Sequence, residues 1–143
     1  MEIDNIDGPA TLPVMHIVGH GIDIVETARI ARLVADHGER FLYRCFTKAE
    51  QVYAADHARR IELLAGRFAA KEAILKVLGT GWSNGIAWTD VEILRRPSGA
   101  PTVVMHGRCK QLADELGIDQ WWVSISHIST HATASAIGTA SGV

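Results

Sequence analysis

The sequence predicts a single α+β domain with a mainly antiparallel sheet and a long central helix. The predicted elements run in the order strand, helices, two strands, helix, two strands, which groups helices and hairpins instead of alternating them. The chain has 143 residues, of which 48% are hydrophobic, and this suits one domain with a substantial core. We expect that domain over 14–143. Residues 1–13 are expected to form a polar N-terminal arm, because Gly8, Pro9 and Pro13 interrupt them.

The first element is predicted to be a strand from Val14 to Val25. Strand alternation puts Asp23 on the face opposite Ile22 and Ile24. Glycines inside a strand mark a bulge or a place where another backbone or a ligand comes close. The strand contains two of them, Gly19 and Gly21.

Helical signals dominate the next segment. Thr27 is expected to cap a helix over 27–37, and Gly38 to end it. Thr47 and Glu50 have the spacing of a capping box, which predicts that a second, short helix begins there.

The strongest helical signal covers residues 61–78 and ends at Gly79. Its apolar residues recur at helical spacing, which predicts one buried stripe. They are Ile61, Leu64, Phe68, Leu75 and Leu78.

The second half of the chain is predicted to form hairpins around one helix. That helix is expected over 108–116, and one face of the strand that follows it carries Trp121, Val123, Ile125 and His127. The predicted strands are 89–96, 102–105, 121–128 and 131–138.

The composition excludes several classes of protein. Lys and Arg total 14 and Asp and Glu total 16, for a net charge of −2, which argues against binding nucleic acid through bulk charge. No apolar run approaches the roughly 20 residues that cross a bilayer, so no membrane partner is expected. Two cysteines and no secretory signal predict a cytoplasmic protein in a reducing compartment.

Two carboxylates are candidates for chemistry. Glu72 lies on or beside the apolar stripe of the long helix, where it either pairs with Lys76 at i+4 or ligates a metal beside a phosphate-binding Lys76. Asp23 is either an edge-strand charge facing water or a second oxygen ligand. Two carboxylates completed by phosphates and waters are a usual way to hold Mg²⁺.

Three further features have a structural and a functional interpretation. The run Gly79, Thr80 and Gly81 is either a helix end followed by a turn or a loop whose backbone amides approach a phosphate. His127 is a satisfied core histidine or a ligand-binding group. A cluster of basic residues is either a solvated helix face or a surface that binds an acidic protein partner. Its members are Arg29, Arg32, Arg40, Arg44 and Lys48.

Taken together, the motifs resemble the holo-[acyl-carrier-protein] synthase family, the short, trimeric branch of the 4′-phosphopantetheinyl transferases. The resemblance covers residues 16–138 and is carried by GIDIVETARI (21–30), LAGRFAAKEAILKVLGTG (64–81), the GAP turn (99–101) and VSISH (123–127). It implies Mg²⁺-dependent transfer of 4′-phosphopantetheine from coenzyme A to a serine hydroxyl of apo acyl carrier protein, with release of 3′,5′-ADP. The holo carrier would serve fatty acid or polyketide synthesis. It also implies a homotrimer with active sites between subunits.

The resemblance assigns roles to individual residues. Asp23 and Glu72 correspond to the Mg²⁺ ligands, and Lys76 to the lysine that contacts the reacting phosphate. The residues expected to line the coenzyme A site are Arg59, Arg67, Lys76, Gly79, Thr80, Gly81, Pro101 and His127. The acidic helix of the carrier is expected to dock on Arg29, Arg40, Phe41 and Arg44.

The chain departs from the family pattern at His20, where an apolar residue is usual, and at Trp82 and Trp88, for which core packing is the default interpretation. No base for the serine proton is identified. Two other functions compete with transfer. One is a trimeric module that binds coenzyme A or a carrier without catalysis, and the other is a Mg²⁺-dependent phosphohydrolase.

Overall fold

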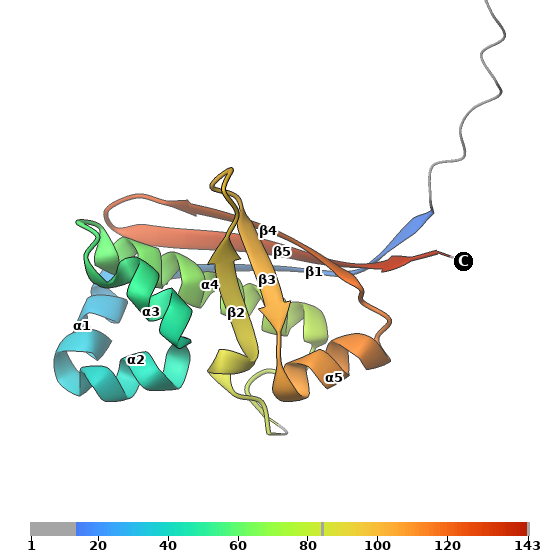
Figure 1. Cartoon of the computed structure of the whole chain (residues 1–143), viewed down its shortest axis with the longest axis horizontal. Helices are drawn as coiled ribbons and strands as arrows, with labels where there is room; N and C mark the ends of the chain where they lie inside the picture. Colours follow the sequence, from blue (N-terminus) through green and yellow to red (C-terminus); the bar gives the residue numbers. More distant parts are fainter. Residues whose placement is uncertain (1–13, 84, 143) are drawn as a thin grey trace, which may run out of the picture.

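A computed structural model of the chain describes residues 14–83 and 85–142, so the expected arm over 1–13 lies outside the described residues. The α+β class is confirmed (Figure 1). In chain order the elements are β1 (Met15–Glu26), α1 (Thr27–His37), α2 (Glu39–Cys45), α3 (Lys48–Ala55), α4 (Arg60–Leu78), the 3₁₀ turn η1 (Trp88–Asp90), β2 (Val91–Arg95), β3 (Pro101–Met105), α5 (Gly107–Glu115), β4 (Gln120–His127) and β5 (His131–Ser141).

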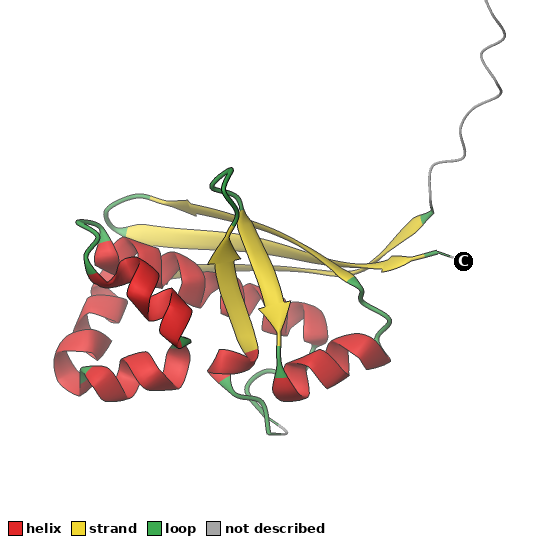
Figure 2. Cartoon of the chain, viewed as in Figure 1, coloured by secondary structure: helices red, strands yellow, loops and turns green. Residues whose placement is uncertain are grey.

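The strands form two separate antiparallel sheets. β1, β5 and β4 make a three-stranded sheet in that order, and β2 and β3 make a hairpin of their own. Figure 2 shows that the helices lie on one side of the three-stranded sheet, so its other face is not covered by a helix. The antiparallel prediction is confirmed, with the difference that the described strands do not join into one continuous sheet.

Helix α4 is the centre of the fold. It packs against all three strands of the larger sheet and also against α1, α3, α5 and β2. The predicted apolar stripe is largely buried, but so are residues outside it, among them four alanines, Ala65, Ala69, Ala70 and Ala73. Because these side chains are small, the sheet and the surrounding helices can approach the axis of α4 from several directions. None of the described helices is apolar over a length that would cross a membrane.

Strand β1 makes its closest approach to α4 at Gly21. A Cβ atom on Gly21 would lie 2.0 Å from the carbonyl oxygen of Ala73 and 3.1 Å from Cβ of Lys76. The close approach predicted from the glycine pair is therefore found, and the backbone that comes close is that of α4. The predicted bulge is present as well, between Ile17 and Gly19.

The two faces of β1 have opposite environments. Gly21 and Val25 are buried and Asp23 is half-buried against the helices, whereas Ile22 and Ile24 are 59% and 66% exposed. The predicted alternation is confirmed. Asp23 does lie on an edge strand, but its side chain is only 20% exposed and is on the inner face, because the outward face of the strand carries the isoleucines.

A buried ion pair fixes the other side of α4. Lys71 Nζ lies 2.8 Å from Glu50 Oε1, and both side chains are 0% exposed. Glu50 also accepts hydrogen bonds from the backbone amides of Thr47 and Ile93, at 2.8 and 3.0 Å, and Lys71 donates to carbonyls of η1 and β2. The capping box is thus confirmed, and the same carboxylate ties α3 to α4 and β2. Burial lowers the pKa of Lys71, while Glu50 opposes that shift.

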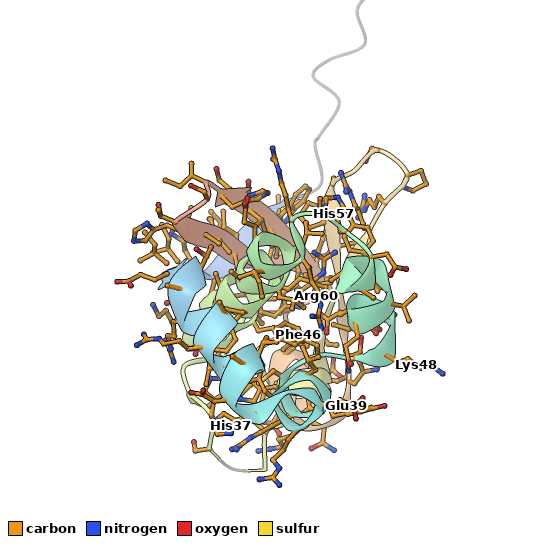
Figure 3. The ribbon with its side chains drawn as sticks, turned by 90° about the vertical axis from the view of Figure 1, so that its left-hand side faces the viewer. His37, Glu39, Phe46, Lys48, His57 and Arg60 are labelled. Carbon is orange, nitrogen blue, oxygen red and sulfur yellow. The ribbon has the colours of Figure 1, made fainter. Side chains whose placement is uncertain are left out.

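Two predictions at the start of the helical region need correction. Thr27 does not cap α1, because it is already helical and its hydroxyl donates to the carbonyl of Ser129 at 2.7 Å. Residues 39–45, for which no element was predicted, form α2 after the left-handed turn at Gly38. Phe46, which follows α2, is 1% exposed and lies centrally among the helices when the molecule is viewed from the side of α1 and α2 (Figure 3).

The second half follows the prediction with shifted boundaries. The strand expected over 89–96 begins at Val91, because η1 occupies the preceding residues, and β5 extends to Ser141 instead of ending at Gly138. The extension follows from pairing, since the outer part of β5 bonds to the beginning of β1.

We predict that Gly21→Ala destabilises the protein strongly. The added methyl would meet the backbone of α4, which cannot move aside as a side chain can, so the free energy of unfolding should fall by about 3 kcal/mol. Urea unfolding measures this loss. Gly19→Ala is the matched comparison, because its Cβ would meet the Val77 side chain at 3.1 Å, and it should cost clearly less. Equal losses for the two variants would contradict this account.

Candidate active site

The approach of β1 to α4 brings two predicted site residues into contact. Lys76 Nζ donates to Asp23 Oδ1 at 3.2 Å and to the carbonyl oxygen of Ile22 at 2.7 Å. The Lys76 side chain is 54% exposed and that of Asp23 is 20% exposed. Among the described residues Lys76 pairs with Asp23 and not with Glu72, so the simple i,i+4 ion pair is not the explanation of Glu72.

Glu72 lies one helical turn before Lys76 and is half-buried. Its Oε1 accepts a hydrogen bond from the indole Nε1 of Trp82 at 3.3 Å. Asp23 and Lys76 are therefore in contact where β1 crosses the C-terminal half of α4, and Glu72 lies one turn before Lys76 on the same helix. We refer to these three residues as the acid–lysine cluster.

The loop that follows α4 begins as a normal helix end. Gly79 is left-handed, with φ of 78°, and its amide donates to Leu75 at 2.9 Å. The predicted helix end is therefore confirmed. Thr80 and Gly81 continue into the loop, where the Ser83 hydroxyl donates to the Thr80 carbonyl at 2.7 Å.

A second group of predicted residues lines one cleft of about 180 Å³. It lies beside the N-terminal half of α4, next to the β2–β3 hairpin and the end of β4. Of the expected coenzyme A residues, the cleft holds Arg67, Pro101 and His127. Arg59 is exposed just before α4 and does not line it.

Arg67 is the buried cation of the cleft. Arg67 is only 7% exposed, and its guanidinium lies 4.5 Å from the centre of the Tyr53 ring. Burial lowers the pKa of Arg67. Its Nε is buried and has no hydrogen-bond partner among the described residues. A buried donor normally has an acceptor, so this wall of the cleft suits an anionic ligand.

His127 is not a core histidine, because its side chain is 27% exposed and lines the cleft. Its Nδ1 lies 2.7 Å from Glu62 Oε2. This contact orients the imidazole and commits Nδ1, which leaves Nε2 for another partner. Glu62 was not predicted, since 65 positions separate the two residues and neither segment carries a signal of the other.

Tyr53 and Arg95 are the other cleft residues that the sequence did not indicate. The Arg95 guanidinium donates to the Tyr53 hydroxyl and lies 5.7 Å from the centre of its ring. Tyr53 comes from α3 and Arg95 from the end of β2, so only the packing of α3 against β2 brings them together.

The residues expected to receive the carrier do not all lie on the surface. Arg29, Arg40 and Arg44 are exposed on α1 and α2. Phe41 is only 8% exposed and packs edge-on against Phe46, with ring centroids 5.8 Å apart. The structure thus corrects the expectation that the Phe41 ring is presented to a partner.

The two cysteines are not candidates for a nucleophile. Burial raises the pKa of the Cys45 thiol to about 11 and that of the Cys109 thiol to about 12. Both thiols therefore stay protonated near neutral pH.

Comparison with known proteins identifies the class of protein. Residues 19–134 match the 4′-phosphopantetheinyl transferase superfamily. A curated relative, the holo-[acyl-carrier-protein] synthase of Koribacter versatilis, is 47% identical over 121 residues, which cover 85% of this chain and 97% of the relative.

Solved structures agree with this class. The Plasmodium yoelii acyl carrier protein synthase with ADP bound aligns with a TM-score of 0.78 at 32% identity, covering 90% of this chain and 99% of that one. The Helicobacter pylori holo-[acyl-carrier-protein] synthase in complex with coenzyme A aligns with a TM-score of 0.74 at 32% identity, covering 84% of this chain and 99% of that one. The chain therefore belongs to the holo-[acyl-carrier-protein] synthase family, as its motifs predicted, and is a transferase.

Proposed function

We propose that this enzyme transfers 4′-phosphopantetheine from coenzyme A to a serine hydroxyl of an apo acyl carrier protein and releases 3′,5′-ADP. The observation that carries the proposal is the acid–lysine cluster, because family membership alone does not require that Asp23 and Lys76 come into contact one helical turn from Glu72. Phosphoryl transfer depends on positioning and on neutralising charge more than on a protein nucleophile, and this cluster supplies groups for both.

Asp23 and Glu72 are the proposed Mg²⁺ ligands. Both are hard oxygen donors, and no group of three or more potential ligands occurs among the described residues. Two protein carboxylates suit a cation that keeps several positions for phosphate oxygens and water. When bound, Mg²⁺ would neutralise charge on the pyrophosphate of coenzyme A.

The proposed role of Lys76 is to stabilise charge at the reacting phosphate. Its ammonium donates hydrogen bonds to Asp23 and the Ile22 carbonyl, but the side chain is 54% exposed, so it can turn toward a phosphate. In the reaction the serine oxygen bonds to the phosphorus that bears the pantetheine, the bond from that phosphorus to the oxygen of the leaving 3′,5′-ADP breaks, and the serine proton passes to water. A lysine beside the phosphorus favours the charge that the leaving group gains.

The cleft is the proposed site for the phosphorylated nucleoside end of coenzyme A. Arg67 offers a buried donor without a partner, and His127 is held in place by Glu62. We propose that coenzyme A also contacts Arg59, Pro101, Gly79, Thr80 and Gly81.

The exposed arginines of α1 and α2 are the proposed docking surface for an acidic carrier. Arg29, Arg40 and Arg44 are accessible, and Phe41 is left out because it is buried. Opposite charge on the two partners would speed their encounter and fix their relative orientation.

We propose that the enzyme is a homotrimer with sites completed between subunits. The uncovered face of the larger sheet is rich in apolar side chains: Ile22 is 59% exposed, Ile24 66% and Trp122 46%. The strand register puts them on the same face, since Ile22 pairs with Ser135 and Trp122 with Ile137, two positions along β5. Large apolar side chains exposed together on one sheet face support an interface with another protein chain.

We also propose that residues 14–143 form one domain and that the protein works in the cytoplasm. Both cysteines are buried free thiols, which fits a reducing compartment.

Replacing either proposed metal ligand should abolish transfer without unfolding the protein. Asp23→Asn and Glu72→Gln keep the size of the side chain but remove its charge, and transfer should fall about a hundredfold or more. The measurement is the mass of an apo carrier after incubation with coenzyme A and Mg²⁺. Circular dichroism checks the fold. Near-normal turnover of a variant at saturating Mg²⁺ would remove that residue from the metal site.

The mass of the carrier, measured together with coenzyme A binding and phosphate release, separates the competing functions. Transfer adds the mass of phosphopantetheine to the carrier. No mass gain with any carrier, together with coenzyme A binding, would indicate a binding module. Free phosphate from coenzyme A without a carrier would indicate a phosphohydrolase.

Arg29→Glu should impair carrier recognition more than coenzyme A binding. Reversing an exposed charge at an electrostatic interface should raise KM for the carrier about tenfold. Lys110→Glu is the matched charge reversal on α5, which lies at the far end of the molecule from α1 (Figure 1), and it should leave both KM values near those of the wild type. An equal loss of carrier and coenzyme A binding in Arg29→Glu would contradict a specific docking role.

Ile24→Lys should convert the trimer to monomers, because it puts three charges into the apolar interface of the assembly. Analytical ultracentrifugation measures the change in mass. Val52→Lys is the control, since Val52 is 66% exposed on α3, away from the sheet face, and it should remain trimeric. A trimeric Ile24→Lys variant would exclude this face as the interface.

A further inference from the structure

We infer that Trp82 is a positioning residue for the metal carboxylate: its indole N–H holds the side chain of Glu72 in the orientation that receives the divalent cation. The inference rests on the proposed role of Glu72. It goes beyond that proposal because core packing is the default interpretation of Trp82, and a packing role requires no contact with the site.

The first support is the hydrogen bond itself. Trp82 Nε1 lies 3.3 Å from Glu72 Oε1, and no other described residue donates a hydrogen bond to this carboxylate. A carboxylate has two oxygens with about four acceptor positions. An indole on Oε1 therefore restrains the group while Oε2 stays available to a cation.

The second support is that the indole is itself held in place. Its ring stacks on Trp88 with centroids 3.5 Å apart, and Trp88 stacks on Phe68 at 4.6 Å. Phe68 precedes Glu72 by one turn of α4, and the Trp88 carbonyl accepts a hydrogen bond from the buried Lys71 at 3.1 Å. The donor is thus tied to the same helix as the carboxylate that it restrains.

The third support is the position of Trp82 in the chain. It directly follows Gly79, Thr80 and Gly81, so the contact that restrains Glu72 also brings the far end of this loop back to α4. Glutamate loses considerable side-chain freedom when it is ordered. A donor that orders it before the cation arrives removes that cost from binding, and outer partners of metal ligands commonly act in this way.

The test measures cation binding in the absence of turnover. Mn²⁺ is titrated into the full chain with saturating coenzyme A and no carrier, and free Mn²⁺ is followed by electron paramagnetic resonance. A titration of coenzyme A alone corrects for Mn²⁺ that it binds by itself. Trp82→Phe keeps an aromatic ring in the stack but lacks the N–H donor, and its Mn²⁺ affinity should be about tenfold weaker than that of the wild type.

Trp88→Phe is the matched control. It keeps an aromatic ring at the centre of the stack, so the Trp82 indole stays supported and can still donate to Glu72, and Trp88 Nε1 itself donates to none of the described residues. Its Mn²⁺ affinity should stay within about twofold of the wild type, because the N–H donor to Glu72 is unchanged. Trp82→His, which restores a ring N–H, should bind Mn²⁺ more tightly than Trp82→Phe. If Trp82→Phe does not fold, Trp82→His should still bind Mn²⁺ within about tenfold of the wild type.

The outcomes separate this inference from the proposed function. Wild-type affinity in folded Trp82→Phe, or equal weakening in Trp88→Phe, would overturn the positioning role while the metal site stands. Mn²⁺ binding by Glu72→Gln as tight as that of the wild type would overturn both, because Glu72 would then not be a ligand.

Discussion

The close approach of β1 to α4 is the constraint on which the candidate site depends. At Gly21 the strand backbone comes so near the helix that a Cβ atom would lie 2.0 Å from the carbonyl oxygen of Ala73. The next inward side chain, Asp23, therefore meets Lys76 at 3.2 Å, one turn after Glu72. The same geometry turns Ile22 and Ile24 outward. The glycine contact thus positions the charged site on the inner face, and strand alternation exposes the isoleucines on the outer face.

The rotation of α4 about its axis is set from the opposite side by Lys71 and Glu50. Burying an ion pair costs desolvation free energy, which only good geometry and additional hydrogen bonds offset. Both are present, since Glu50 accepts two backbone amides besides Lys71. Consecutive helical residues point about 100° apart. With Lys71 fixed in the core, Glu72 is directed to the border between core and solvent, where a carboxylate can be both restrained and accessible.

The proposed binding groups lie at two places along one helix. The cleft is beside Gly66 and Arg67, and the acid–lysine cluster begins at Glu72, roughly 9 Å further along the axis. A long, flexible donor with a phosphorylated nucleoside at one end suits such a separation. So does a site shared between neighbouring subunits, which the apolar outer face of the sheet also supports. In both arrangements α4 is the element that sets the spacing.

The sequence by itself determined the fold class, the capping box and, through its motifs, the family, and it marked Gly19 and Gly21 as sites of a bulge or a close approach. These signals are local, because strand alternation, helical spacing and capping concern residues up to four positions apart. Tertiary structure alone decided that Asp23 pairs with Lys76 across 53 positions and that Glu62 orients His127 across 65. It also buried Phe41 and joined Trp82 to Glu72. Such contacts depend on how elements pack, and packing is fixed by the summed shape of many side chains and not by any segment alone.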